Sequence, residues 1–518
     1  MSSGQSAQGQ ETAAEIIVTT DSDVSNGETS SVAGLVANPG DDGISLREAI
    51  EATNNDPGSY YVRFDGVLSG ATISVVPPAL PPLFGGGVTI DGDVDGDGDP
   101  DVTIEGDGEN ANLGFHVSSG GNTLHALMLE GFTGAGVLLR PEVTPAGLPT
   151  RFEGNTVDGL IMKAIGGIGI DVESVLCTPE YSPACPSYFM WANTALTNNY
   201  IEASHAGIKF WISGTGDRVE GATVTGNVIR VAGEIADTGI ALQPGGDSDD
   251  VVISDVLIAH NTVEGEVIGI DVAAGTGRSQ HSSTERIRVV DNRIHLVKQS
   301  PNYCCVGIQV QVGSDDPSFA IGPPIRYLDD NSVRDVLVRA NSISGTLEAG
   351  VSVAAGIGGG GRRNRIGDVR IVHNHIRTSK ATIGISVATG DGNPYRDRYA
   401  ADNRINEVVV KANDVEISEG RFQGDAGGGV GASGIALVGG HKYGRDNVLR
   451  NIQVTRNSIN SPYVGIRVIG GLGPTARRNR VICVPLTGNR IRHALERVSI
   501  RSNVDGATRN KARVACPD

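Results

Sequence analysis

The chain has 518 residues with a formal net charge of −18, and only 4% of the residues are aromatic. An acidic balance of this size argues against nucleic acid as the main partner, because phosphate binding needs a basic surface. No apolar run reaches the roughly 18 residues of a membrane span. Residues 1–14 are small and polar and carry no signal peptide, so we expect a disordered leader left after removal of an export signal.

A short amphipathic helix is predicted over residues 45–53. Ser45 and Glu48 have the spacing of a capping box, and Leu46 and Ile50 share one helical face. Terminal units of repeat proteins need a cover for the apolar face that no neighbour buries. We therefore expect this helix to close the first coil of a solenoid.

The segment around this helix resembles the N-terminal signature of secreted bacterial β-helix proteins, usually spelled Cys-Ser-Leu-Arg-Glu-Ala. The matching residues here are Ile44-Ser-Leu-Arg-Glu-Ala49, so Ile44 replaces the cysteine and any role of that cysteine is absent. The resemblance covers residues 15–140, including Val88-Thr-Ile-Asp-Gly92 and Asn122-Thr-Leu124. It implies a secreted right-handed parallel β-helix, but this group has no single activity to carry over.

An aspartate-rich segment follows at residues 91–101, reading Asp-Gly-Asp-Val-Asp-Gly-Asp-Gly-Asp-Pro-Asp. A tight loop of this composition can turn several oxygens toward one hard cation. Position 12 of the segment is Val102 rather than Glu, so the segment departs from the helix–loop–helix calcium pattern. We predict a structural Ca²⁺ and no organic cofactor, with an acidic turn without metal as the alternative. The predicted ligands are Asp91, Asp93, Asp95, Asp97 and Asp99.

A two-part sequence motif occurs nine times, with its asparagines between residues 155 and 457. Each copy has an Asn two residues before Ile or Val, followed by a Gly-apolar-x-apolar segment. Successive asparagines lie 44, 28, 34, 31, 49, 33, 39 and 44 residues apart. Self-similarity at roughly 20–50 residues indicates a solenoid, and the uneven spacing places insertions in loops. The pairs are Asn155 with Gly169, Asn199 with Gly207, Asn227 with Gly239, Asn261 with Gly269, Asn292 with Gly307, Asn341 with Gly350, Asn374 with Gly384, Asn413 with Gly434 and Asn457 with Gly465.

Apolar and polar residues alternate within the repeats, which predicts strands with one buried and one exposed face. No helical periodicity separates these strands. We therefore predict an all-β, single-domain, right-handed parallel β-helix of three-strand coils with about ten or more turns. A β-propeller is the alternative. The repeated Asn is expected to form a structural ladder through its side-chain amide.

The domain organisation follows from this fold. We expect a leader at 1–14, an N-terminal cap with the first coils and the Asp-rich loop at 15–140, coils with long loops at 141–482, and a C-terminal coil and cap at 483–518. Six cysteines favour structural disulfides in an oxidising compartment over a zinc site. Cys177 would pair with Cys185 and Cys483 with Cys516, whereas the adjacent Cys304 and Cys305 form either a vicinal disulfide or free thiols.

Side chains that face outward from the Gly-apolar-x-apolar strands should stack in columns, because neighbouring coils lie about 4.8 Å apart. Ionisable and amide groups concentrate in the first five coils, which predicts a binding groove there. These outward pairs are Asp171 with Glu173, Lys209 with Trp211, Ala241 with Gln243, Asp271 with Ala273, and Gln309 with Gln311.

Asp171 and Glu173 should place two carboxyls on one face at about 7 Å, a separation that suits glycoside hydrolysis. Lys209, one coil along, would keep one carboxylate ionised while the other stays protonated. His205 and Glu202, in the preceding turn, are secondary acid–base candidates. An ordinary charged patch is the alternative interpretation.

Substrate-binding residues are expected beside this pair. Seven of the 22 aromatic residues fall between 181 and 211, including both tryptophans, which suggests either a stacking platform for a sugar ring or a small satellite core. The predicted binding residues are Trp211, Trp191, Gln243, Asp271, Gln309 and Gln311.

The sequence therefore predicts a secreted carbohydrate-active enzyme, most simply a glycoside hydrolase acting on a polysaccharide or oligosaccharide. A lyase acting on a uronate polymer is one alternative, using the Arg-rich loops at 362–365, 395–398 and 477–480, which otherwise form salt bridges. A non-catalytic carbohydrate-binding or adhesin-like β-helix is another. The sequence leaves open whether the solenoid forms a homo-oligomer.

Overall fold

The computed structural model describes residues 13–516, with gaps. The residues left undescribed inside this range are 110, 142–149, 175–187, 234–237, 247, 266, 277–278, 298–304, 315–328, 358–360, 380–382, 392–399, 419–431, 441–443, 474 and 505. The predicted leader lies largely outside the described residues, and its boundary is corrected, because Ala14 already begins strand β1 (Ala14–Val18). In the described residues no helix is long and apolar enough to cross a membrane.

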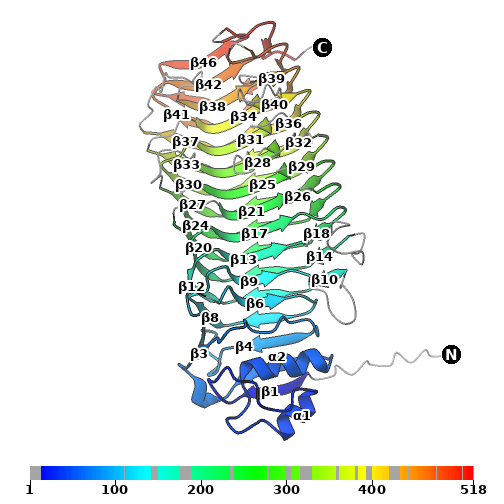
Figure 1. The fold of residues 1–518 in the computed structure, drawn as a ribbon. Coiled ribbons are helices and arrows are strands. Elements are labelled where there is room, and N and C mark those ends of the chain that lie inside the picture. Colours follow the sequence, from blue (N-terminus) through cyan, green and yellow to red (C-terminus); the bar gives the residue numbers. More distant parts are fainter. Residues whose placement is uncertain are drawn as a thin grey trace, which may run out of the picture.

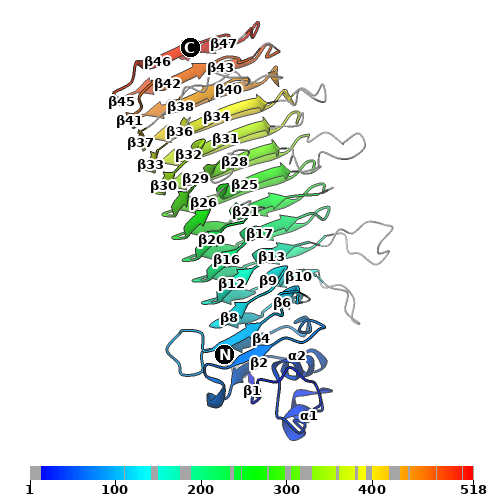
Figure 2. The same cartoon turned by 60° about the vertical axis from the view of Figure 1, so that its left-hand side comes forward.

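The chain forms a right-handed parallel β-helix, as predicted (Figures 1 and 2). Each coil contributes strands to three stacked sheets, and every named pairing between strands is parallel. Sheet C, which carries the candidate site, has 12 strands in the described chain. These are β6 (Leu113–Val117), β9 (Ala135–Leu139), β13 (Ile168–Glu173), β17 (Ala206–Ile212), β21 (Thr238–Pro244), β25 (Ile268–Thr276), β28 (Val306–Ser314), β31 (Ala349–Ile357), β34 (Ile383–Asp391), β38 (Ser433–Val438), β42 (Val464–Ile469) and β46 (Glu496–Arg501).

Sheet B precedes sheet C within each coil and has 13 described strands. These are β3 (Thr72–Ser74), β5 (Val102–Glu105), β8 (Leu127–Glu130), β12 (Ile161–Ile165), β16 (Tyr200–Ala203), β20 (Val228–Val231), β24 (Thr262–Gly265), β27 (Arg293–Leu296), β30 (Ser342–Gly345), β33 (His375–Thr378), β37 (Asp414–Ile417), β41 (Ser458–Asn460) and β45 (Arg490–Arg492).

Sheet A completes the coil with 20 described strands, because a bend splits it in the early and last coils. Besides β1, these are β2 (Tyr60–Phe64), β4 (Val88–Asp91), β7 (Thr123–His125), β10 (Arg151–Glu153), β11 (Thr156–Asp158), β14 (Met190–Ala192), β15 (Ala195–Thr197), β18 (Arg218–Glu220), β19 (Thr223–Thr225), β22 (Val252–Ser254), β23 (Leu257–Ala259), β26 (Ser283–Val290), β29 (Ser332–Arg339), β32 (Arg365–Val372), β36 (Arg404–Lys411), β40 (Val448–Thr455), β43 (Arg480–Ile482), β44 (Leu486–Thr487) and β47 (Lys511–Arg513). A small sheet pairs β35 (Ala400–Ala401) with β39 (Gly444–Arg445).

The predicted asparagine ladder follows sheet A. In each rung the side-chain oxygen of one Asn accepts the backbone N–H of the Asn one coil earlier, as at Asn292 and Asn341 with 3.0 Å. The amide nitrogen of Asn292 donates to the backbone carbonyl of Ile258 at 3.0 Å, so the buried turn is satisfied. The rungs are Asn199, Asn227, Asn261, Asn292, Asn341, Asn374, Asn413, Asn457 and Asn489.

The first phrase of the predicted repeat is wrong in register. Asn155 does not join this ladder: it lies at the bend within sheet A, where its Oδ1 accepts the N–H of Asn122 at 3.0 Å. The ladder position of that coil is held by Leu160, whose N–H donates to Asn199 at 3.0 Å. The 44-residue interval therefore joins two different corners of the coil.

A second asparagine ladder, which sequence reasoning missed, precedes sheet A. Its Asn rungs are Asn331, Asn364, Asn403, Asn447, Asn479 and Asn510. Ser282 and Asp217 hold the equivalent position in earlier coils, where their side chains accept the N–H of Val251 and of Phe189. Several of the residues before the rungs adopt positive φ, as Asp330 does at 59°, which is a conformation that Asp and Asn tolerate.

The N-terminal cap confirms the capping helix. Helix α2 (Leu46–Asn55) begins with the predicted capping box between Ser45 and Glu48, and its Leu46 and Ile50 are fully buried over the first coil. A further helix, α1 (Val32–Ala37), lies outside it at the end of the solenoid (Figure 1). A single 3₁₀ turn (Gly66–Leu68) follows β2.

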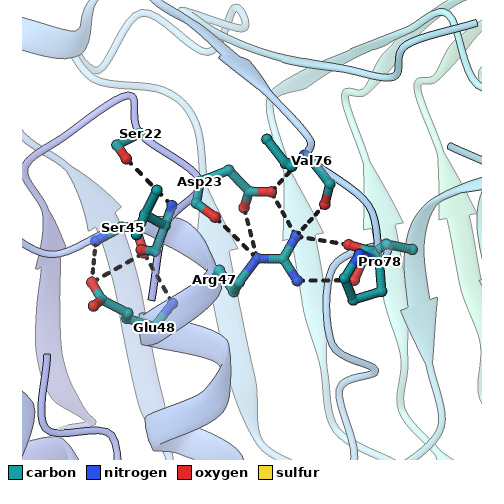
Figure 3. Close-up of polar contacts among 9 residues, drawn as sticks. Ser22, Asp23, Ser45, Arg47, Glu48, Val76 and Pro78 are labelled. Carbon is teal, nitrogen blue, oxygen red and sulfur yellow. Dashed lines mark hydrogen bonds and ion pairs between the residues drawn. The ribbon is translucent and has the colours of Figure 1, made fainter. Parts of the chain in front are cut away.

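Arg47 ties this cap to the body of the molecule (Figure 3). Its guanidinium forms an ion pair with the fully buried Asp23 carboxylate at 2.5 Å. It also donates to the backbone carbonyls of Val76, Pro78 and Ala79 at 2.9–3.0 Å. Each of these neighbouring residues therefore has a local structural role. Ser45 caps helix α2 and Leu46 enters the core. Arg47 ties α2 to Asp23 and to residues 76–79.

The C-terminal end is held by the disulfide Cys483–Cys516, as predicted. Cys305 is buried. Cys177, Cys185 and Cys304 lie outside the described residues, and so do the pairings predicted for them.

Candidate functional site

The predicted columns are present on the outer face of sheet C. Asp171 pairs in register with Lys209, and Glu173 pairs with Trp211, between β13 and β17. The columns continue through β21, where Ala241 and Gln243 follow. The longest connections of the chain, such as the one from Glu173 to Met190 and the one from Ser314 to Ser332, begin or end at a strand of sheet C.

Asp171 is held in a poorly solvated position. Its Oδ1 is buried and has no hydrogen-bond partner in the described structure, although the residue as a whole is half-buried. Burial raises the pKa of the Asp171 carboxyl to about 7, and the charge of Glu173 adds to the rise. Lys209 and Arg140 oppose the rise without cancelling it. Near neutral pH both the protonated and the ionised forms of Asp171 are therefore populated.

Glu173 is paired with a cation that sequence reasoning missed. Arg140 follows β9 directly and brings its guanidinium within 3.3 Å of the Glu173 carboxylate. Both side chains of this ion pair are partly exposed to solvent. This contact could have been predicted by extending the columns one coil toward the N-terminus. Leu139 is in register with Val172, which places Arg140 beside Glu173.

Lys209 and Trp211 form a pair of their own. The Lys209 ammonium lies 4.5 Å from the centre of the Trp211 ring, a cation–π contact. The ring also lies against the backbone of Gly245, where the Cβ of any larger residue would approach it to 2.5 Å. Trp211 is half-buried, so it borders the site but does not present two open faces.

Two of the predicted binding residues are buried in a hydrogen-bonded network. Asp271 has no exposed surface and accepts from Gln243 at 2.6 Å and from Gln311 at 3.0 Å. Gln309 donates to Gln311 at 2.6 Å. The predicted substrate role of Asp271 and Gln311 is therefore corrected, because a buried, satisfied group offers nothing to a ligand. Gln243 and Gln309 remain half-buried at the surface.

The aromatic cluster is mostly core. Trp191 is fully buried in sheet A and stacks on Phe152 at 5.6 Å, and Phe189 packs against it at 6.1 Å. The prediction that Trp191 stacks on a sugar is therefore wrong, since its ring has no exposed face. The satellite-core alternative holds for these residues. Trp211 is separate from them, on the outer face of sheet C.

The secondary acid–base candidates lie away from the columns. Glu202 belongs to β16 of sheet B, accepts a hydrogen bond from Tyr200 and lies 3.6 Å from Arg230. His205 is in the turn between sheets B and C, where its N–H donates to the Gly167 carbonyl at 2.9 Å. Neither is brought into register with Asp171, so we do not include them in the candidate site.

The Asp-rich loop brings three carboxylates together. Ligand atoms of Asp93, Asp95 and Asp101 all lie within 4.8 Å of one another. The predicted set is changed: Asp91 accepts from the Tyr61 hydroxyl, and Asp97 and Asp99 are not in the group. The N–H of Asp97 lowers the pKa of Asp95, but burial and the surrounding carboxylates raise it by more. Three crowded carboxylate oxygens are donors that suit Ca²⁺.

We expect Ca²⁺ to raise the unfolding temperature by several degrees and a chelator to reverse the effect, because a ligand that binds only the folded chain stabilises it. The double variant Asp93→Asn/Asp101→Asn should lose this response, whereas Asp99→Asn, a matched change in the same loop, should keep it. Thermal unfolding followed by circular dichroism measures the shift. An identical curve with Ca²⁺ and with chelator would exclude a structural ion here.

The arginine-rich loops proposed for a lyase are partly occupied by ion pairs. Arg363 lies 2.7 Å from Asp330 and 3.0 Å from Asp329, and Arg478 lies 2.5 Å from Asp446. Arg396 and Arg398 lie outside the described residues. The salt-bridge interpretation therefore holds for Arg363 and Arg478.

No protein-family model and no curated protein sequence matches this chain. Solved structures match at low identity. The mannuronan C-5 epimerase AlgE4 A-module of Azotobacter vinelandii is 12% identical, with 90% of this chain and 93% of that one covered and a TM-score of 0.38. The periplasmic alginate epimerase AlgG is 11% identical (86% and 77% covered, TM-score 0.30). The Dettilon tailspike protein is 14% identical (88% and 64% covered, TM-score 0.34). Likeness at this level carries no conclusion about activity.

Proposed function

We propose that the protein is a carbohydrate-active enzyme that cleaves glycosidic bonds by hydrolysis on the outer face of sheet C. The observation that carries this proposal is the unequal environment of two neighbouring carboxyls. Asp171 is poorly solvated, with a pKa of about 7, whereas Glu173 is paired with Arg140 at 3.3 Å. Two carboxyls whose environments differ in this way divide into an acid and a base or nucleophile.

The spacing of the pair fits this division. Alternate residues of one strand lie about 7 Å apart on the same face, within the range in which one carboxyl protonates a leaving oxygen and the other activates water. Asp171 would give its proton to the glycosidic oxygen as the bond to the anomeric carbon breaks. Glu173 would take a proton from the water that attacks that carbon. Proton exchange with solvent then restores both groups.

The surroundings supply a binding surface for an extended substrate. Trp211 offers the apolar edge of a ring, and the half-buried amides of Gln243 and Gln309 lie in the same pair of columns farther along the solenoid. A polymer lying along the columns would meet successive coils about 4.8 Å apart. The clustered carboxyls favour an enzyme over a purely adhesive surface. The disulfide favours a location outside the reducing cytosol.

Elimination on a uronate polymer is the second candidate, and one observation favours it. Two cations, Lys209 and Arg140, flank the carboxyl pair, and a cation beside the substrate carboxylate is what neutralises a uronate. Both chemistries would use Asp171 for proton transfer. They differ in the product, because elimination leaves a double bond and adds no water.

A panel of neutral and acidic polysaccharides decides between these chemistries. Hydrolysis should release reducing ends without new ultraviolet absorbance, whereas elimination should produce both. Mass spectrometry should show that products of hydrolysis have gained one water for each bond cleaved, whereas products of elimination have gained none. Binding to a polysaccharide without any product from the whole panel would favour the adhesin and contradict the enzyme.

A further inference from the structure

The two ends of the solenoid carry opposite charge. Residues 13–58, the acidic cap, contain nine acidic residues and one basic residue, a net charge of −8. Residues 486–516, the basic end, contain seven basic and two acidic residues, a net charge of +5. Figure 1 places β1 and α1 at one end of the solenoid and β46 near the opposite end. In a chain whose total charge is −18, this local positive charge is concentrated on one terminal surface.

The basic side chains at that end are all exposed to solvent, and within the described structure they form no ion pair with an acidic residue. By contrast, Arg363 and Arg478 in the coils before it are paired with aspartates. The positive charge of the basic end is therefore available to a partner. The seven residues are Arg490, Arg492, Arg497, Arg501, Arg509, Lys511 and Arg513.

The basic end also leaves part of the core uncovered. Val498 and Ile500 take the inward positions of β46, in register with Ile466 and Val468, which are 1% and 0% exposed. Val498 and Ile500 are themselves 40% and 47% exposed, and nearby Leu495 is 84% exposed. In the described chain β45, β46 and β47 each pair with one strand only, so three strand edges are open. Open edges and uncovered apolar side chains are features that proteins normally cover.

The acidic cap offers a complementary surface. Helix α2 already buries the first coil, but three apolar residues outside it stay exposed: Ile17 at 42%, Val24 at 52% and Val36 at 56%. Exposed carboxylates surround them in the sequence, namely Glu15, Asp21, Glu28, Asp41 and Asp42. An apolar centre with charged residues around it is the usual composition of a protein interface.

We propose that the basic end binds the acidic cap of a second copy of this chain, so that solenoids stack head to tail. Contact between two basic ends or two acidic caps would bring like charges together, which disfavours symmetric pairing. Head-to-tail contact uses two different surfaces and does not close, so it produces short linear stacks whose length grows with concentration. The contact would cover Val498 and Ile500 and the open edge of β46. Because these charges lie at the surface, salt screens their attraction and should weaken the contact between copies. At physiological ionic strength the Debye length is about 8 Å, so charges farther apart than this attract one another only weakly.

Sedimentation velocity of the full chain at low and high salt tests this proposal. Wild-type protein should form larger species at low salt and high concentration and return to monomer at high salt. Two variants carry local charge reversals, Arg497→Glu/Arg501→Glu at the basic end and Asp41→Lys/Asp42→Lys at the acidic cap. Each alone should associate more weakly than the wild type. An equimolar mixture should associate more strongly than either variant alone, because the unaltered basic end of one variant can bind the unaltered acidic cap of the other.

Thermal unfolding of each variant controls for folding, and Arg339→Glu, on β29 in the middle of the solenoid, is a matched change that should leave association unchanged. Wild-type protein that stays monomeric at low salt overturns the proposal. So does association that both charge reversals leave intact, or a mixture that associates no more strongly than either variant alone although both variants are folded. An apolar-to-polar change, Val498→Ser/Ile500→Ser, should weaken association without altering its dependence on salt.

Discussion

Replacing Asp171 by Asn should lower kcat by about 10²–10⁴-fold on any polysaccharide that the wild-type protein cleaves, the range that general acid catalysis contributes. The amide keeps the shape of the side chain but cannot give up a proton to a leaving oxygen. Initial rates of reducing-end release measure the loss. Glu173→Gln should cause a loss of at least similar size, because the attacking water then has no base.

The fold of the Asp171→Asn variant should be at least as stable as that of the wild type near neutral pH. The folded-state pKa of Asp171 is raised to about 7 from the ordinary value of 3.8, so the folded state binds more protons than the unfolded state between these values. Stability attributable to this group therefore falls as pH rises from about 4 to about 7, and Asn removes that loss. Activity lost with the unfolding temperature maintained separates catalysis from folding.

Glu202→Gln is the matched control for these variants. It changes a carboxylate one coil along, on strand β16 of sheet B, where Glu202 contacts Tyr200 and Arg230. Because Glu202 is not in register with Asp171, we expect the kcat of this variant to remain within about twofold of the wild type. Its fold should also persist, since a surface ion pair contributes only about 0–1 kcal/mol to stability. Asp171→Asn retaining full activity would remove the candidate site from consideration.

Replacing Arg47 by Ala should destabilise the N-terminal cap by about 3–5 kcal/mol, because it leaves the buried Asp23 carboxylate without its partner. Three backbone carbonyls, at Val76, Pro78 and Ala79, would lose a donor as well. Chemical denaturation followed by circular dichroism measures the change. Hydrogen exchange should show that opening begins in α2 and β1 rather than in the central coils.

The control for this variant is Arg63→Ala. Arg63 forms an exposed ion pair with Glu15 at 3.5 Å, and its loss should cost less than about 1 kcal/mol. The double variant Arg47→Met/Asp23→Asn should recover part of the stability lost in Arg47→Ala, since no buried charge then remains unpaired. If Arg47→Ala and Arg63→Ala are equally mild, the cap does not depend on the buried pair.

The fold could be predicted from the sequence because the repeated Asn and Gly motif recurs in successive coils of the solenoid. The same pattern placed Asp171, Glu173, Lys209 and Trp211 on one face, which the strand register confirms. The prediction of register failed where the same residue type, Asn, occupies two different positions in the coil. Asn155 and Asn199 look alike in sequence, yet one lies within sheet A and the other follows it.

Burial of particular side chains could not be predicted from alternation. Asp271 occupies an outward position in β25, and Trp191 lies in a segment that looked like an insertion, yet both have no exposed surface. Period-two patterns state which way a side chain points from a strand, but not what covers it afterwards. Partners from a preceding coil, such as Arg140 for Glu173, likewise require the register between coils.

The pH dependence of kcat/KM tests the proposed active site most directly, since this profile reports the ionisation of the free enzyme. Because Asp171 must be protonated to act as the acid, activity should fall as pH rises through about 7. Lys209 lowers the pKa of Asp171, so Lys209→Met should move this alkaline limb to higher pH. A limb near 7 that shifts in this direction supports the account. A wild-type profile without a limb near 7, or one that Lys209→Met leaves in place, would contradict it.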